Sequence, residues 1–519
     1  MKIAPLQNTV ILRLKVMVLM LSISSSISSS MASSSCRNSV TGVDHAFGDL
    51  APYTSNLTAA QCCAKCSATQ GCLLWVLETD SHCPGCCFLK KTVSCTPCAS
   101  LPTLTTTIGV PCTRAMASRV SGNWTCPSTL APTPPPVGPP LPAPVSQLSA
   151  RFRNWTYYVG PYDGFVVPPK AGNFRGQTLT DTAVVYEKSE QDTLPGRYRL
   201  TYLFFNGTNG ANGYEAAIAT SDDLLHWSFG KGGDDGNGIA LKRSPVPGAY
   251  DYGGVTLGGF LFSSNILRGP RKLRMLNGSY WALYGCYPSR AGYEAGIGGQ
   301  GVAYSKDGVA WERWSETTPV VPGATKTVVP WNQAWSSHVV YQPFLLEVNK
   351  TFYDFYNAAG VNQFGASAEE SGIATLPAAA NFPGVPKAGG GAFDTAWRPH
   401  AASPVIRSGS KDAFDTNMAS DPKIFWDAEQ HVYVCFYFGV GGASHGHASI
   451  LVAFSVNLID WEKDPTPLYL AGGHPSGIDS MHTHKISIVY DDEGVGYMYY
   501  TAVGGKGRGI ALLTSKPVE

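Results

Sequence analysis

Two adjacent stretches decide the fold: SDPKIFWDAEQHVYVCFYFGV, residues 420–440, and LVAFSVNLIDW, residues 451–461. The first holds two runs of β-branched and aromatic residues, 424–426 and 432–440, separated by a polar break. The second is an apolar run that leads into Ser455, Asn457 and Trp461. Residues of these types favour strands, and short polar breaks between them are typical of antiparallel turns. We therefore expect a meander of short strands here.

The same pattern occurs five times from about residue 149 onward. Each unit has an aromatic-rich strand, a loop and a strand of small residues, and three units place Asp or Asn shortly before a Trp. The equivalent alanines are Ala219, Ala303, Ala374, Ala453 and Ala511, at steps of 84, 71, 79 and 58 residues. One propeller blade takes about 40 to 50 residues, and insertions extend it. The repeat predicts a mainly β fold, a five-bladed β-propeller over residues 149–519, whereas a β-sandwich would leave it unexplained.

Residues 1–32 have the features of a signal peptide. Basic residues precede a short apolar run from Val16 to Ile23, and small residues follow it. A spanning helix needs about 20 apolar residues, so we expect cleavage rather than a signal anchor, and no later segment is apolar enough to span a membrane. The sequence therefore predicts a secreted, extracellular protein. Six Asn-x-Ser/Thr sequons agree with this, at Asn56, Asn123, Asn154, Asn206, Asn277 and Asn349.

Twelve of the 14 cysteines lie between Cys36 and Cys126. After a signal peptide, a dense and even set of cysteines predicts disulfides, and the few histidines nearby disfavour zinc. Cys286 and Cys435 lie in apolar strand patterns and are expected to be buried free thiols. A helix is predicted over residues 58–68.

The segment LTAAQCCAKCSATQGCLLWVLETDSHCPGCCFLKK, residues 57–91, resembles the PAN/Apple family. The resemblance implies a small disulfide-rich α+β module at residues 36–115 whose partner is a protein or a glycan. Residues 116–148 follow as a linker, because nine of the 18 residues at 127–144 are proline, a composition that favours an extended spacer.

Polar residues precede the expected inner strand of each blade, where a propeller has its central funnel. The candidate residues, from the first blade to the fifth, are Asp181, Arg268 with Arg271, Tyr341 with Gln342, Asp421 with Lys423, and His482, His484 and Lys485. Because each begins the inner strand of a different blade, we expect Asp181, Gln342, Asp421 and His484 to converge on one funnel.

The repeated Ser-x-(Asp/Asn)-Leu-x-x-Trp element and the segment from His484 to Pro517 resemble the glycoside hydrolase clan of families 43 and 32, the arabinanases, levansucrases and invertases. The resemblance implies catalytic carboxylates from the first three blades. Asp181 matches the first position, but Gly269 and Gln342 stand where the clan has Asp and Glu. Asp251 is a candidate for the missing second carboxylate, and Glu369 or, preferably, Glu370 for the acid.

The leading hypothesis is a secreted glycosidase that acts on a plant or algal-type polysaccharide, with Asp181, Asp251, Glu370 and Asp421 as catalytic residues. The expected substrate-binding residues are Arg268, Tyr341, Gln342, Lys423, His484 and Lys485. Neither a metal nor another cofactor is expected, and the net charge of +1 gives no reason to expect nucleic acid as a partner. The alternative is a non-catalytic glycan-binding protein on the same propeller, and a weaker one is a glycosyltransferase or phosphorylase whose Arg268, Arg271 and Lys485 bind phosphate.

Overall fold

The computed structural model divides the chain into two units, residues 1–132 and 133–519. It describes residues 139–169, 180–205, 213–230, 237–323, 331, 333–377, 381–387 and 395–518, together with short strands at 74–78, 86–90, 106–109 and 232–233. No helix in these parts of the chain is long and apolar enough to cross a membrane.

The described part of the first unit is a three-stranded antiparallel sheet in the order β2-β1-β3. Its strands are β1 (Leu74–Glu78), β2 (Cys86–Lys90) and β3 (Thr106–Gly109). The helix predicted over residues 58–68 and the disulfides of the module lie outside the described residues.

The second unit is built from five antiparallel groups of four strands within the described residues. The first group is β5 (Thr180–Glu187), β6 (Tyr198–Phe205), β7 (Tyr214–Ser221) and β9 (Asn237–Leu241), with β8 (Gly232–Gly233) beside β9. The second is β10 (Gly254–Phe260), β12 (Ser279–Tyr287), β13 (Gly299–Ser305) and β14 (Glu312–Arg313), with β11 (Met275–Leu276) beside β12. The third is β15 (Val339–Val348), β16 (Thr351–Val361), β17 (Ser367–Pro377) and β18 (Arg398–Pro399). The fourth is β19 (Met418–Asp427), β20 (Val432–Val440), β21 (Ala448–Ser455) and β22 (Glu462–Lys463). The fifth is β23 (His482–Tyr490), β24 (Gly496–Gly504), β25 (Gly507–Thr514) and β4 (Thr156–Tyr157).

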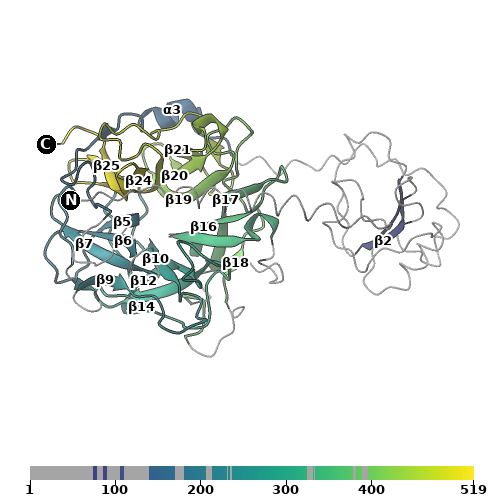
Figure 1. The fold of residues 1–519 in the computed structure, drawn as a ribbon, viewed down its shortest axis with the longest axis horizontal. Coiled ribbons are helices and arrows are strands. Elements are labelled where there is room, and N and C mark those ends of the chain that lie inside the picture. Colours follow the sequence, from purple (N-terminus) through teal and green to yellow (C-terminus); the bar gives the residue numbers. More distant parts are fainter. Residues whose placement is uncertain are drawn as a thin grey trace, which may run out of the picture. The chain divides into compact units, whose positions relative to one another are not determined.

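The groups follow one another around the domain, from β5–β7 through β12 and β16 to β20 and β24 (Figure 1). Successive groups are joined at single parallel pairs, such as Tyr214 with Gly254, Glu369 with Met418 and Ala448 with His482. Antiparallel strands within each group and parallel contacts between groups are the arrangement of a β-propeller.

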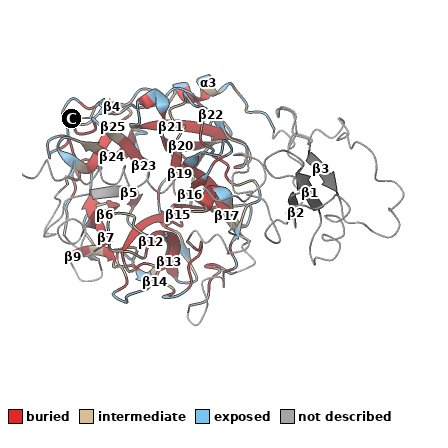
Figure 2. Ribbon diagram, turned by 45° about the vertical axis from the view of Figure 1, so that its right-hand side comes forward, coloured by how far each residue is buried: buried red, intermediate tan, exposed pale blue. Residues whose placement is uncertain are grey.

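Five hydrophobic clusters fill the spaces between successive groups, and they explain why the strands bury both faces (Figure 2). One cluster joins the first group to the second, and the next three continue this series to the fifth group. The last cluster packs Tyr499 and Leu512 of the fifth group against Val185 and Leu200 of the first. The ring of cores is therefore closed, which a sandwich of two sheets would not produce.

The ring is closed by a strand from the beginning of the domain, not by β25. β25 is the third strand of its group and pairs with the two-residue strand β4. Just before β4, the short helix α3 (Val145–Ala150) places Leu148 in the core, and Phe152 packs edge-on against Phe436 at 5.2 Å. The packed domain thus includes residues that the proline-rich composition assigned to the linker.

The repeated Ser-x-(Asp/Asn) element is a turn at the end of the third strand. The Ser221 hydroxyl accepts hydrogen bonds from the N–H groups two and three residues on, at 3.2 and 3.0 Å. The Asp223 carboxylate accepts two more, at 2.9 and 2.8 Å. Side chains that satisfy backbone donors in this way favour tight turns. Equivalent turns occur at Ser305 with Asp307 and at Ser455 with Asn457, and Trp227, Trp311 and Trp461 then pack into the cores.

Each of the five inner strands has a register shift typical of a β-bulge, near the start in β5, β15, β19 and β23 and past the middle in β10. The register shifts lie at residues 181–184, 257–259, 340–343, 420–423 and 484–487. A bulge twists the strand and changes the direction of its side chains, and bulges are frequent beside active sites. Cys286 and Cys435, on strands of the second and fourth groups, are buried free thiols, as predicted.

Candidate functional site

The inner strands begin at one end of the domain, which we call the mouth. It is marked by Thr180, Gly254, Val339, Met418 and His482, the first residues of these strands. Parallel pairs place the starts of β10, β19 and β23 beside the starts of the third strands of the preceding groups, β7, β17 and β21. The bulges of β5, β15, β19 and β23 lie at this end of their strands.

Glu369, on β17, is a half-buried carboxylic acid at the mouth. One of its oxygens accepts hydrogen bonds from the Asn357 amide and the Ser420 hydroxyl, and Asn357 also donates to Ser420 at 2.8 Å. Burial raises the pKa of Glu369 from its ordinary value of 4.5 to about 7, although the two hydrogen bonds and Lys485 lower it. Glu294 contributes to the rise through its charge. A carboxyl group with this pKa exists in both protonation states near neutral pH.

Glu294 is the second carboxylate of the mouth and lies in the loop between β12 and β13. Lys485 donates a hydrogen bond to it at 2.9 Å, and only 8% of the Lys485 side chain and 18% of the Glu294 side chain are exposed. Lys485 also donates to the Tyr293 hydroxyl and lies 5.0 Å from the ring centre. The Arg508 guanidinium lies 4.7 Å from the same ring. Tyr293 therefore contacts two cations, both of which also donate to its hydroxyl.

A row of tyrosines extends from this loop across the mouth. The rings of Tyr293 and Tyr214 are 5.9 Å apart, Tyr214 and Tyr287 are 5.7 Å apart, and Tyr287 and Tyr341 are 6.4 Å apart. Burial raises the pKa of Tyr341, and the charges of Glu369 and Glu294 raise it further. The charges of both carboxylates therefore act on Tyr341.

Three further residues expected at the funnel also lie near the inner-strand starts. Lys485 holds Glu294, as described above, and His484 lies beside Arg508, with 3.3 Å between its Nε2 and the guanidinium. Gln342 is 2% exposed, packs against Gly258 and Gly285, and has no hydrogen-bond partner for either amide atom among the described residues.

Asp421 is at the mouth end of β19 but is engaged in a buried ion pair. Its carboxylate accepts a hydrogen bond from Lys423 at 2.6 Å, and both residues are at most 5% exposed. The backbone of Asp421 lies in the left-handed region, with φ of 54°, inside the bulge. The pairing holds both charged groups inside the protein, where neither is readily available to a substrate.

Two other expected catalytic residues lie away from the mouth cluster. Asp251 is fully buried, pairs with Arg313 at 3.0 Å and accepts a hydrogen bond from Tyr284 in the core between the first two groups. Burial raises the pKa of Asp251 and Arg313 opposes that rise. Glu370 points to the face of β17 opposite Glu369 and accepts hydrogen bonds from the backbone and hydroxyl of Ser408. These contacts give both acids structural roles.

The arginines expected to bind substrate are not at the mouth. Arg268 is exposed and pairs with Glu429, which lies just beyond the end of β19. Arg268 therefore lies at the end of the inner strands that is opposite the mouth. Arg271 is 2% exposed, with its guanidinium 3.7 Å from the centre of the Phe262 ring. The backbone of Asp181 pairs with Leu203 near the start of β5, and its side chain is outside the described part of the structure.

No group of three or more His, Cys, Asp or Glu residues suited to a metal ion occurs in the described ranges. His447, His482 and His484 lie in a row, with neighbouring ring centres 6.0 Å apart. The nitrogens of His447 and His482 face the Met481 carbonyl and the Ala448 N–H group. These two rings thus satisfy backbone groups.

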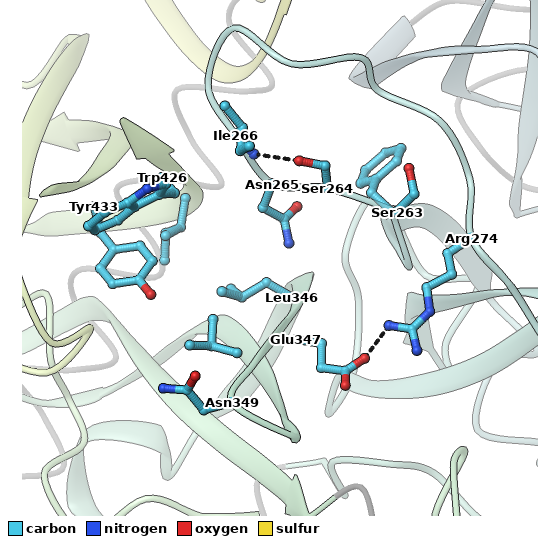
Figure 3. Close-up of a pocket in the computed structure, with 13 residues that line it drawn as sticks. Ser263, Ser264, Asn265, Ile266, Arg274, Leu346, Glu347, Asn349, Trp426 and Tyr433 are labelled. Carbon is cyan, nitrogen blue, oxygen red and sulfur yellow. Dashed lines mark hydrogen bonds and ion pairs between the residues drawn. The ribbon is translucent and has the colours of Figure 1, made fainter. Parts of the chain in front are cut away.

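A cavity of about 330 Å³ lies at the end of the domain opposite the mouth (Figure 3). We call it the hairpin pocket, because residues 346–349 at the end of the β15–β16 hairpin form one wall. Residues 262–266, Arg274, Ile424, Trp426 and Tyr433 form the rest. It contains none of the residues of the mouth cluster, so it is separate from the candidate site.

Several residues that build the mouth cluster were not predicted from the sequence as site residues. Tyr293 and Glu294 lie in a loop and Arg508 near the start of β25, all outside the inner-strand pattern, and Glu369 was the less favoured of two adjacent acids. The one local signal was the pair Tyr293-Glu294 within a glycine-rich loop between two predicted strands. Such a loop is a common place for binding residues on a rigid scaffold.

No protein-family model matches the sequence, and no curated protein has a significant match to it. Two solved structures resemble the domain to the same degree. One is described as "Glycoside hydrolase", with 23% identity, a TM-score of 0.55, and coverage of 72% of this chain and 96% of that one. The other is described as a complex of BT0996 and RGII, with 23% identity, a TM-score of 0.55, and coverage of 72% and 95%.

A thermostable family-43 glycoside hydrolase is more distant, with 12% identity, a TM-score of 0.42, and coverage of 66% of this chain and 96% of that one. At this distance it does not support the specific family 43 and 32 clan. At 23% identity the two better matches establish the fold and not the activity. The domain therefore shares a propeller-like fold with structures of glycoside hydrolases.

Proposed function

We propose that this chain is a glycoside hydrolase whose reaction takes place at the mouth, with Glu369 as the general acid and Glu294 as the second carboxylate. The observation that carries this proposal is the contrast between two neighbouring acids. Burial raises the pKa of Glu369 to about 7, while Glu294 is ion-paired with a lysine. Glycoside hydrolysis needs one carboxylic acid that protonates the leaving oxygen and one carboxylate that acts as base or nucleophile.

The surrounding groups suit this division of roles. Ser420 and Asn357 hold one oxygen of Glu369, which leaves its other oxygen to carry a proton toward a substrate. Lys485 and Tyr293 position Glu294. Of the row of tyrosines, Tyr214 and Tyr287 are fully buried, so only Tyr293 and Tyr341 are partly exposed for contact with a sugar. The roles assigned to Tyr341, His484 and Lys485 in substrate binding belong to this proposal. Glu369 and Glu294 take the places that were expected for Glu370 and Asp251.

The substrate we propose is an oligosaccharide from a polysaccharide outside the cell. The predicted signal peptide and the PAN/Apple-like module support secretion and a separate binding function for residues 36–115. The first substrate screen should contain arabinan, xylan, fructan and galactan fragments. RGII-derived oligosaccharides are added because one structural neighbour is a complex of BT0996 and RGII.

The test compares the wild type with Glu369→Gln and Glu294→Gln. Loss of an acid or base costs about 10²–10⁴ in rate, so both variants should lose turnover while retaining binding. With aryl glycosides, Glu369→Gln should lose little on a good leaving group, which needs no proton, whereas Glu294→Gln should lose activity on all of them. Glu429→Gln, at the opposite end of the inner strands, is the matched control and should retain wild-type turnover.

The alternative of a non-catalytic glycan-binding protein is favoured by one observation. Gln342 places an uncharged amide where the resembling clan has its Glu, and both amide atoms lack partners among the described residues. Gln342 is 2% exposed, so a sugar would hydrogen-bond to that amide only if the side chains that cover it moved. Oligosaccharide binding that Gln342→Ala weakens, with no turnover of any substrate by the wild type, would support this alternative over hydrolysis.

A further inference from the structure

The hairpin pocket has no role in the proposed reaction, yet its walls have the chemistry of a sugar-binding site. The ring centres of Trp426 and Tyr433 are 4.9 Å apart, the ring planes meet at 61°, and both side chains are only partly buried. The Asn265 side-chain oxygen is buried and has no hydrogen-bond partner among the described residues. Figure 3 shows the indole, the phenol and this amide around one space. Aromatic rings with a few polar groups are typical of small-ligand sites, and 330 Å³ is near the lower end of their range of about 300–1,000 Å³.

Asn349, on the rim of this pocket, is the first residue of the sequon Asn349-Lys350-Thr351. Val348 pairs with Thr351, so Asn349 and Lys350 form a two-residue hairpin turn, with φ of 49° and 60°. Asn349 is exposed. Its amide nitrogen is therefore open to attachment of a glycan, and the pocket begins beside it.

We propose that Asn349 carries an N-linked glycan whose first sugars occupy the hairpin pocket against Trp426 and Tyr433. The tether makes the binding intramolecular, so the effective sugar concentration at the pocket is in the millimolar range and weak stacking is sufficient. The apolar faces of the sugars cover the indole, and their hydroxyl or acetamido groups supply the partner that Asn265 lacks. The glycan thus completes a wall between the second, third and fourth groups of strands.

Asn277 offers a matched control in the same protein. It too begins a sequon, and with Gly278 it forms a two-residue turn between β11 and β12, with φ of 54° and 71°. It is exposed, and the space around Gly278 is open. A glycan at Asn277 therefore extends into solvent, whereas one at Asn349 has a pocket to enter.

The test uses the full chain secreted from a eukaryotic host. Peptide mass mapping should find Asn349 glycosylated. Under native conditions, peptide-N-glycosidase should release the Asn349 glycan about tenfold more slowly than the Asn277 glycan, a factor that corresponds to about 1.4 kcal/mol of protection. Trp426→Ala should bring the rate at Asn349 up to the rate of an unprotected site, and Tyr433→Ser should act in the same direction.

Three outcomes would overturn the proposal. The first is an unmodified Asn349 in the secreted protein. The second is native release at Asn349 that Trp426→Ala does not accelerate. The third is a tryptophan fluorescence response to free chitobiose that Trp426→Ala abolishes and that is as strong in the glycosylated wild type as in Asn349→Gln, which would show that the Asn349 glycan leaves the pocket open to free oligosaccharide.

Discussion

Replacing Glu369 with Gln should stabilise the protein at neutral pH and not at acid pH. The folded protein raises the pKa of Glu369 from 4.5 to about 7, chiefly by burial. Between these two values the folded protein holds a proton that the unfolded chain has released, so the free energy of unfolding falls as pH rises. The interval is about 2.5 pH units at 1.36 kcal/mol per unit, which makes the full loss about 3 kcal/mol. Gln does not titrate, so Glu369→Gln escapes this loss.

The assay is urea unfolding of the wild type and Glu369→Gln at half-unit steps from pH 4 to 8. The difference between them should grow from pH 4.5 and level off near pH 7. Ser420→Ala should act differently, because it keeps the acid but removes a hydrogen bond that favours the ionised form. One hydrogen bond to a charged group contributes about 1.5–3 kcal/mol, so the pKa of Glu369 should rise further by about 1–2 units.

Ser487→Ala is the control, because Ser487 is a buried serine of another inner strand that accepts a hydrogen bond from the Val185 N–H group. Its cost should not depend on pH. A Glu369→Gln difference that is the same at pH 4.5 and pH 8 would refute the argument that Glu369 is held in its protonated form. The assay needs no substrate, so it tests the protonation of Glu369 independently of the proposed hydrolysis.

Three further predictions concern charged groups of the domain. Lys485→Met should reduce turnover by about 10²-fold or more. It should also raise the pKa of Glu369, so the alkaline limb of the pH–rate profile should move to higher pH. An unmoved limb would show that the charge of Lys485 does not act on Glu369. Arg313→Ala leaves Asp251 buried without its cation and should cost about 3–5 kcal/mol in urea unfolding, with turnover per folded molecule unchanged. Asp421→Asn breaks the ion pair with its lysine partner and should likewise lower stability rather than turnover; full stability with turnover abolished would instead favour Asp421 as a catalytic residue.

The repeat of the fold was predictable because each unit carries the same local chemistry. The aromatic strands and the turns at Ser221, Ser305 and Ser455 depend on neighbouring residues, so their pattern is visible in the sequence. The closing strand β4 was not predictable, because it is two residues long and is defined only by its pairing with β25. The packing of Leu148 on the core was hidden by the prolines that precede it.

The candidate site was predictable only in part, for a geometric reason. The starts of the inner strands indicated the mouth, where Tyr341, His484 and Lys485 lie, because the spacing of the repeat fixes which strand is innermost. The choice between Glu369 and Glu370 depends on a single step of register, which moves a side chain to the opposite face of the strand. Glu294 reaches the mouth through a loop, whose course is set by tertiary contacts and not by periodicity.

The position of the acid explains how the mouth can lack the carboxylate expected on its third inner strand. Gln342 occupies that strand, and Glu369 arrives from β17, two strands outward in the same group, where β17 pairs with the start of β19. The inner strand of the fourth group then contributes Ser420 as a hydrogen-bond donor to the acid. Glu294 comes from the second group and Lys485 from the fifth. Because four groups supply these residues, the site exists only when the ring is closed, and each core between two groups helps to set the distance between the two carboxylates.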